Sequence, residues 1–420
     1  MGEARKVVVP DGATVRLGHV EGDLLVGWDA TIEGEGSPPR VIVDGVARFR
    51  GDCTVIGSLE AKSVECRGGD LEVEGDLKAR TRVRVRDGSL KVGGSLEARE
   101  VKVDDTLAVR GAVKAGEVSV GNKVDALGDF EAREVSVGGS LVSHGPFKAE
   151  KVSVGGLAKF NGRVDVEDLD VGGHVELAGG RVEKSSVGGS LEARGPLEFS
   201  SIDVGGSVVL AGGRGGDVSV GGVLVTKEPL SYFGSIDVGG KVELKGPCKG
   251  RRVRVGGSLK VEGDLELASD LRVGGSARLT GRLSASSIKV GGVLRAEEVR
   301  AEEEVRVGGL LSAPKGIEAR YVEIGRRGRI EGPVRAEEVR IGPRARAEDM
   351  WADEIRLEAR SRARNLYGRR IYIERGCVVS GEVKYVDELV VEERVRLAKE
   401  PEKVERPEDI GLGRPEGREG

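Results

Sequence analysis

The sequence predicts an all-β chain that folds as a single long triangular parallel β-helix, or β-solenoid, with about 17 residues per coil. An apolar residue recurs every 16 to 19 residues over most of the chain, apolar and polar residues alternate between these positions, and glycine pairs follow many of them. A fixed spacing of this kind is typical of repeat proteins. The recurring residues are Cys66, Val85, Val103, Val120, Val137, Val154, Val171, Val187, Val204, Val220, Val238, Val255, Val273, Val290, Val307, Ile324, Ile341, Leu357, Ile373 and Val391.

One repeat encodes three short strands. After Val137, the apolar or small residues form three pairs, each with one polar residue between its members. This alternation is typical of a strand with one buried face. Three strands joined by three corners make one triangular coil, and stacked coils bury a continuous core. The pairs are Leu141 and Ser143, Phe147 and Ala149, and Val152 and Val154.

Glycine and proline mark the corners. Glycine accounts for 68 of the 420 residues, about twice its ordinary share of ~7%. Sharp corners often require a positive φ, which glycine adopts without steric cost, so we expect this conformation at the glycine pairs. Proline falls at the second corner, where no ladder donor is needed. The glycine pairs include 138–139, 205–206 and 256–257, and the prolines are Pro146, Pro196 and Pro247.

The pattern divides the chain into three regions. Residues 1–65 are strand-like but irregular, and we expect N-terminal coils with a cap there. Residues 66–397 form the regular solenoid. Residues 398–420 are rich in Pro, Glu and Gly and lack the period, so the sequence predicts a disordered tail. We interpret its one apolar spot, Ile410 and Leu412, as part of a plain tail rather than a docking motif.

Composition favours a cytoplasmic protein. Charged residues reach 33%, yet the net charge is only −4. No apolar leader precedes the first strand, and no apolar run approaches the ~18 residues of a membrane span. The four cysteines are far apart and lie in alternating runs. We expect them to be buried small hydrophobes rather than metal ligands or disulfide partners.

Motifs for catalysis or cofactor binding are not found. The three histidines, His19, His144 and His174, belong to no cluster of His, Asp and Glu, and the glycine pairs open strands rather than phosphate-binding helices. We therefore expect no cofactor, no metal and no small-molecule substrate. A carbohydrate-active β-helix enzyme is the least favoured alternative, because coil length barely varies and only two tryptophans are available for sugar stacking.

A basic face is the one surface feature that changes systematically. The outward position of the third strand holds Ser or Asp from Ser119 to Asp237 and mainly Arg or Lys afterwards, and the first strand changes in the same way. Either corner glutamates such as Glu297, Glu298, Glu337 and Glu338 offset this charge, or the face binds an anionic polymer, a lipid surface or an acidic protein. The candidate residues are Arg254, Arg272, Lys289, Arg306, Arg340 and Arg356 on the third strand, and Lys260, Arg278, Arg295, Arg329, Arg346 and Arg362 on the first.

The glycine-cornered coil, as in EVSVGGSLVSHGPFKAEKVSVGG at residues 134–156, resembles the bactofilins, a family of polymer-forming cytoskeletal proteins. The resemblance spans residues 66–397. It implies a right-handed β-helix and end-to-end assembly into filaments without nucleotide. It carries over no catalytic residues. The regular region is much longer here than in typical bactofilin cores.

Three functions follow in order of preference. The first is a structural protein that polymerises with itself through its terminal coils, because end coils expose unpaired backbone groups. We expect the contact at Val391, Val395 and Leu397 near the C-terminal end. The second is a rigid monomeric binding module that presents the basic face to an acidic partner. The third is the carbohydrate-active enzyme.

Overall fold

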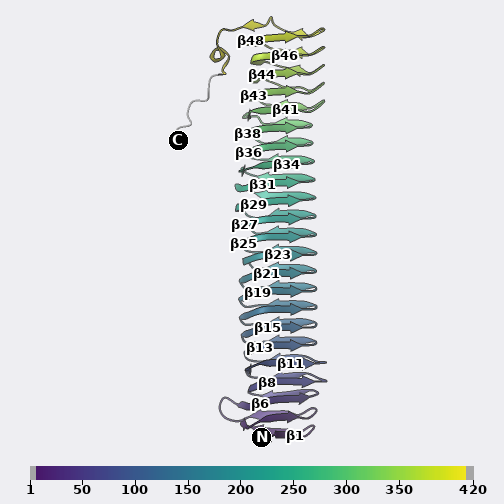
Figure 1. Ribbon diagram of the computed structural model, residues 1–420, viewed down its shortest axis with the longest axis vertical. Coiled ribbons are helices and arrows are strands. Elements are labelled where there is room, and N and C mark those ends of the chain that lie inside the picture. Colours follow the sequence, from purple (N-terminus) through teal and green to yellow (C-terminus); the bar gives the residue numbers. More distant parts are fainter. Residues whose placement is uncertain (1–5, 413–420) are drawn as a thin grey trace, which may run out of the picture. The chain divides into compact units, whose positions relative to one another are not determined.

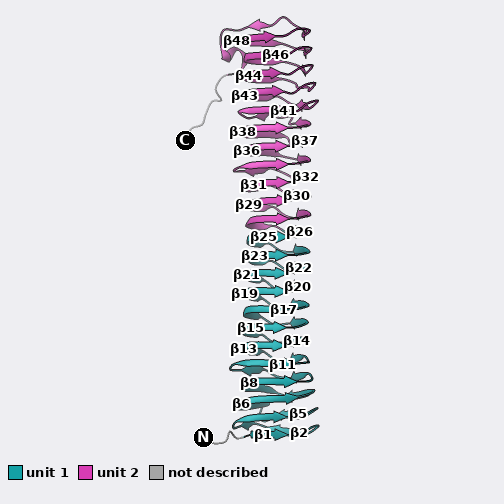
Figure 2. Cartoon of the chain, turned by 45° about the vertical axis from the view of Figure 1, so that its right-hand side comes forward, with its two compact units in different colours: residues 1–211 teal, residues 212–420 magenta. Residues whose placement is uncertain are grey.

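The computed structural model describes residues 6–412. Within this range every regular element is a strand, apart from one 3₁₀ helix, η1 (Pro407–Ile410). The chain divides into two compact units, residues 1–211 and 212–420 (Figure 2). Each unit consists of stacked coils of parallel strands (Figure 1). The predicted all-β solenoid with about 17 residues per turn is therefore confirmed.

A ladder of long strands runs through the first unit. In its regular part each strand pairs in parallel with the strand 16 or 17 residues later, so that Phe130 lies beside Phe147 and Val137 beside Val154. The strands are β1 (Lys6–Val9), β3 (His19–Val20), β4 (Asp23–Val26), β6 (Arg40–Arg50), β8 (Ser58–Arg67), β10 (Leu77–Ala79), β11 (Arg82–Arg86), β13 (Leu96–Val103), β15 (Val113–Val120), β17 (Phe130–Val137), β19 (Phe147–Val154), β21 (Val164–Val171), β23 (Gly180–Val187) and β25 (Leu197–Val204).

Short strands form the remaining face of the first unit. They pair with the same one-coil register, as Leu141 with Ala158 shows. The strands are β2 (Thr14–Leu17), β5 (Thr31–Gly34), β7 (Cys53–Ile56), β9 (Leu71–Val73), β12 (Leu90–Val92), β14 (Thr106–Val109), β16 (Lys123–Ala126), β18 (Ser140–Ser143), β20 (Leu157–Phe160), β22 (His174–Leu177), β24 (Ser190–Ala193) and β26 (Ser207–Leu210).

The second unit repeats this plan. Its long ladder contains β27 (Gly213–Val220), β29 (Leu230–Val238), β31 (Cys248–Val255), β33 (Leu265–Leu267), β34 (Asp270–Val273), β36 (Arg282–Val290), β38 (Glu298–Val307), β40 (Ile317–Glu318), β41 (Tyr321–Ile324), β43 (Val334–Ile341), β44 (Met350–Leu357), β46 (Leu366–Ile373), β48 (Val383–Val391) and β50 (Glu402–Lys403). Its short strands are β28 (Val223–Thr226), β30 (Lys241–Lys245), β32 (Ser258–Glu262), β35 (Ser276–Leu279), β37 (Val293–Arg295), β39 (Leu310–Ser312), β42 (Arg329–Glu331), β45 (Arg362–Ala363), β47 (Val378–Val379) and β49 (Arg396–Leu397).

The second and third predicted strands of a coil usually join into one bent strand. In β19, buried and exposed residues alternate on both sides of two adjacent exposed residues, Glu150 and Lys151. Two neighbouring outward residues reverse the facing of every residue that follows. The corner between the second and third predicted strands is therefore this bend, and it needs no glycine. The coil still has three faces that point inward.

The core is a column of side chains from successive coils. Leu141, Phe147 and Val154 are all at most 2% exposed. The ring centroids of Phe130 and Phe147 lie 4.8 Å apart, and those of Phe147 and Phe160 lie 4.7 Å apart. These separations are within the range at which aromatic rings attract each other. The inward pairs predicted from the sequence therefore meet as one hydrophobic column.

The glycine pairs have a different cause from the one expected. None of Gly138, Gly155, Gly205 or Gly256 has a positive φ. A Cβ on Gly155 would instead overlap the carbonyl oxygen of Gly138 in the preceding coil. Consecutive coils come so close at this corner that no side chain fits between them, and glycine is required for that close approach.

The N-terminal coils join the same ladders as the rest of the first unit. β4 pairs with β1 so that Asp23 lies beside Lys6, whereas Leu24 lies beside Ala47 in β6. The second spacing is longer because residues 35–39 form a loop that an antiparallel bridge between Glu35 and Arg40 closes. The loop bulges from the lowest coils in Figure 1.

The C-terminal segment is ordered as far as it is described, in contrast to the expected disorder. β50 adds to the edge of β48, with Glu402 beside Lys384 and Lys403 beside Tyr385. The chain then leaves the coils, and η1 packs against β46 and β48. Ile410 is only 4% exposed there, so the apolar spot anchors the segment to its own solenoid. Residues 413–420 lie outside the described part.

We predict that Gly155→Ala destabilises the protein by about 1–3 kcal/mol, the usual cost of forcing extra volume into a packed site. The new methyl group would push against the Gly138 carbonyl oxygen and disturb the ladder. Thermal unfolding followed by circular dichroism measures the effect. Ser153→Ala, on the neighbouring outward position, should leave the midpoint unchanged. Equal midpoints for the two variants would contradict the close-approach argument.

Candidate functional site

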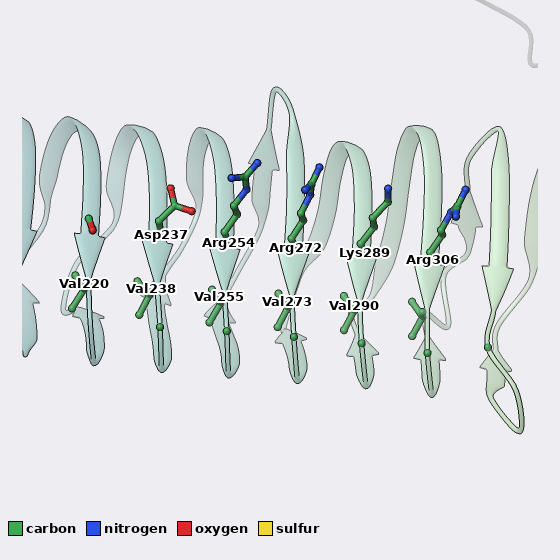
Figure 3. Close-up of a pocket in the computed structure, with 18 of the residues that line it drawn as sticks. Val220, Asp237, Val238, Arg254, Val255, Arg272, Val273, Lys289, Val290 and Arg306 are labelled. Carbon is green, nitrogen blue, oxygen red and sulfur yellow. The ribbon is translucent and has the colours of Figure 1, made fainter. Parts of the chain in front are cut away.

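Four cations predicted from the sequence line a groove in the second unit. Strands β31, β34, β36 and β38 place Arg254, Arg272, Lys289 and Arg306 side by side, one per coil. Their side chains project in the same direction (Figure 3). The glycine corners form the floor of the groove, which has a volume of about 920 Å³. A chain of small residues beneath a row of cations leaves room for a thin ligand.

Acidic side chains offset most of this positive charge. Arg272 Nε lies 2.8 Å from Asp270 Oδ2, while Lys289 Nζ and Arg306 Nε both lie 2.6 Å from Glu304. The hydrogen bond from Lys289 is the main cause that lowers the pKa of Glu304. Asp270 also lies 3.8 Å from Arg254, so each of these two carboxylates serves two cations. Asp237 and Glu323 line the same groove, and four carboxylates therefore balance the four cations.

The offsetting acids are not those proposed from the sequence. Glu297 pairs with Lys315, and Glu298 pairs with Arg282 and Arg300. Asp270 and Glu304 were missed because they lie at the bend of the long strands. The sequence shows only that an acid stands two residues before Arg272 and before Arg306, whereas the register decides which further cations each acid reaches.

The predicted basic column of the first strand is wrong as a single column. Lys260, Arg278 and Arg295 do stack in register. Arg329 instead lies beside Leu310, two positions earlier in the coil, and Arg346 and Arg362 continue from Arg329. These three arginines thus stand immediately after the corner, in the column that holds Ser258, Ser276, Val293 and Leu310 in earlier coils.

The column shifts because the corner changes. Two residues, Gly308 and Gly309, separate Val307 from β39, but four residues separate Ile324 from β42. Each later corner also has four residues. These corners project at the right-hand ends of β41 to β48 in Figure 1. They occupy residues 325–328, 342–345, 358–361, 374–377 and 392–395.

The third residue of each four-residue corner has a positive φ. It is Arg327, Arg344, Arg360 and Arg394 in four corners, with φ between 59° and 62°, and Gly376 in the other. The corners stack through backbone hydrogen bonds: the Arg344 N–H donates to the Ala359 carbonyl at 3.1 Å. A left-handed backbone costs a residue with a side chain roughly 1–2 kcal/mol, and only glycine, Asn and Asp adopt it readily. Arginine at four of five such positions is therefore unusual.

We call the arginines of these corners the arginine ladder. It consists of two columns. One column contains the arginines with a left-handed backbone, and the other contains the arginines that follow them two positions later in the sequence. Sequence reasoning found only three of its members, Arg329, Arg346 and Arg362, although the Arg-x-Arg pattern that begins inside the corner was visible. The ladder consists of Arg327, Arg329, Arg344, Arg346, Arg360, Arg362, Arg394 and Arg396.

The arginine ladder lacks the acids that neutralise the groove. Arg329 pairs with Glu331 at 3.1 Å. Within residues 6–412, no carboxylate lies at ion-pair distance from the other seven arginines. The adjoining third-strand column is partly satisfied, since Arg340 pairs with Glu358 at 2.5 Å and Arg356 lies 5.9 Å from the centre of the Tyr372 ring. Seven of the eight arginines of the ladder thus lack a carboxylate at ion-pair distance within the described residues.

The C-terminal end of the second unit is open. β50 covers only Lys384 and Tyr385 of β48, and the remainder of that strand has no further partner among the described residues. Val391 is 42% exposed, whereas Ile373 at the same position one coil earlier is 1% exposed. Val395 and Leu397 are half-buried, although Cys377 and Val379 beneath them are buried. All three predicted end residues thus lie at this edge.

Other chemically active side chains are scattered or buried. In the part of the chain that the structure describes, no three His, Cys, Asp or Glu side chains gather as metal ligands. His174 Nδ1 lies 2.6 Å from Ser190 Oγ, and His144 Nδ1 lies 3.3 Å from Asn161. Cys53, Cys66, Cys248 and Cys377 are free and buried. Burial raises the pKa of the Cys66 thiol to about 12.

Comparisons with known protein families, with curated proteins and with solved structures find no match for this chain. Among the described residues, none of the helices has the length and apolarity that a bilayer crossing requires. The function must therefore be argued from the surfaces described above.

We predict that Cys66 resists alkylation in the folded protein. Only the thiolate reacts, and a pKa of about 12 leaves almost none of it at pH 8. Iodoacetamide labelling followed by mass spectrometry should find Cys66 unmodified in buffer and fully modified in denaturant. Rapid labelling of the folded protein would contradict its placement in the core.

We predict that Arg344→Gly yields a more stable protein than Arg344→Ala, by about 1 kcal/mol. Both variants lose the side chain, but only glycine relieves the left-handed backbone. Denaturant unfolding measures the difference. Applied to Arg346, where φ is not positive, the same two substitutions should show no advantage for glycine. A preference for alanine at position 344 would argue against the strain.

Proposed function

We propose that this protein is a structural scaffold, similar to the bactofilins, that assembles end to end into filaments without nucleotide. The observation that carries the proposal is the uncovered edge of the last coil, formed by β48 and β49. A free strand edge offers unpaired N–H and C=O groups, which can pair with a strand of another chain. A second copy would continue the ladder that ends here.

Apolar exposure supports this proposal. Val391 occupies an inward position, yet 42% of its surface is exposed because no coil lies above it. Covering such surface stabilises an assembly by about 25 cal/mol per Å². Val395 and Leu397 add to the same edge. A joining coil would therefore gain hydrogen bonds and hydrophobic burial together.

The first coil also has a free edge. Among the described strands, β1 pairs only with β4. Val8 is 64% exposed beside this edge. Both terminal coils thus offer backbone groups for a contact, as a chain of subunits requires. The partial cover from β50 leaves residues 386–391 open at the other end.

We predict that the purified protein forms linear assemblies whose length grows with concentration. Negative-stain electron microscopy and sedimentation velocity measure this directly. The double variant Val391→Asp with Leu397→Asp should raise the concentration needed for assembly at least tenfold, because charge at the edge opposes pairing. Monomers alone at every concentration would refute the proposal.

The control places the same change on a side face. Leu157 is 36% exposed on an outward position of β20. Leu157→Asp should assemble like the unmodified protein. If this variant lost assembly as fully as the double variant, a lateral contact rather than the open end would be responsible.

A further inference from the structure

We propose that the arginine ladder is a binding site for the phosphate backbone of double-stranded nucleic acid. This inference does not depend on end-to-end assembly, because the ladder lies along one corner of the second unit. It rests on three observations. The charge of the ladder is uncompensated, four of its arginines occupy a strained left-handed backbone that glycine would relieve, and its members repeat along a line.

The first observation is the contrast between two rows of stacked cations in the same unit. In the groove, Asp270 and Glu304 bind the cations at 2.6–2.8 Å. Along the ladder, only Arg329 has a carboxylate partner within residues 6–412. Stacked side chains lie about 4.8 Å apart, so like charges repel. An external polyanion would supply the charge that the chain itself provides in the groove.

The second observation is the left-handed backbone. Gly376 shows that glycine fits this corner position, and its φ of 71° is similar to those of the four arginines. Glycine would remove the strain at all of them. Strained residues gather at sites where a side chain serves a function. Retention of arginine at four of the five corners indicates that the side chain itself is needed.

The third observation is the linear arrangement. Five successive corners span about 19 Å at the spacing of parallel strands. Arg327, Arg344 and Arg360 occupy three consecutive corners, and each has a second arginine two residues away. Double-stranded DNA carries one charge per ~1.7 Å of axis. Roughly eleven phosphates therefore accompany a ladder of this length, and those on the side that faces the protein lie within reach of the arginines.

The composition of the ladder favours nucleic acid over other anions. All eight cations are arginine, whose planar fork binds phosphate through two hydrogen bonds. An acidic protein partner would need an apolar anchor at the centre of its interface, and the two columns offer only Val378. A membrane is a plane, whereas this row is a line. Single strands bind largely by stacking on aromatic rings, which the two columns also lack.

The test compares two triple variants of the full-length protein. Arg327→Gly, Arg344→Gly and Arg360→Gly remove three rungs without loss of stability, since each relieves a positive φ. Arg254→Ser, Arg272→Ser and Lys289→Ser remove equal charge from the neutralised groove. Fluorescence anisotropy with a labelled 20-base-pair DNA duplex gives affinities between 50 and 200 mM salt.

We expect the ladder variant to bind the duplex at least tenfold more weakly and with a salt slope shallower by about two to three, because counterion release falls with each lost phosphate contact. The groove variant should bind within threefold of the unmodified protein. The corner at residues 374–377 lacks both arginines, because Gly376 and Val378 stand at their positions. The double variant Gly376→Arg with Val378→Arg completes the ladder and should tighten binding. Thermal unfolding confirms that each variant is folded.

Several outcomes would overturn the proposal. Equal loss in the two triple variants would show that net charge, not the ladder, attracts DNA. Tighter binding of the single strand than of the duplex would exclude backbone recognition of double-stranded nucleic acid. Binding to vesicles of phosphatidylserine or to polyglutamate, without measurable binding to DNA or RNA duplexes, would assign the ladder to a lipid surface or an acidic protein.

Discussion

The parallel hydrogen-bond ladder between successive coils is the constraint on which the rest of each unit depends. It sets every residue beside its counterpart about 17 positions away, at a distance of about 4.8 Å. A choice made at one position is therefore repeated or compensated in the next coil. Phenylalanine stacks on phenylalanine in the core, and glycine lies over glycine at the corner, because the register leaves no alternative.

Because of the same register, outward side chains of successive coils stack on one another, and like charges among them repel. In the first unit, the outward column of the third face holds only Ser or Asp from Ser119 onward. The groove of the second unit accepts cations but places Asp270 and Glu304 between them. The arginine ladder uses neither solution. This combination of charge repulsion and backbone strain is the basis of our proposal that the row binds an anionic polymer.

A solenoid that grows by addition of coils also has to end, and its last strands then lack a partner. At the C-terminal end, β50 covers part of the last strand, and η1 is held to the side through Ile410. The remainder of β48 and β49 stays open, with apolar side chains at inward positions. Assembly would use the end and polyanion binding the corner, and these two surfaces meet only in the last coil, where Arg394 and Arg396 alternate with Val395 and Leu397. A filament could therefore display one arginine ladder per subunit.

The sequence by itself determined the fold class, the length of the coil and the inward positions, because a period of two within a period of 17 encodes strands and their stacking. It also located Arg254, Arg272, Lys289 and Arg306 in one row. Tertiary structure alone decided why the corners are glycine, which acids offset the row, and where Arg329, Arg346 and Arg362 stand. These features depend on contacts between coils and on a corner that is two residues longer. The spacing of residues along the chain does not show which atoms of neighbouring coils come into contact.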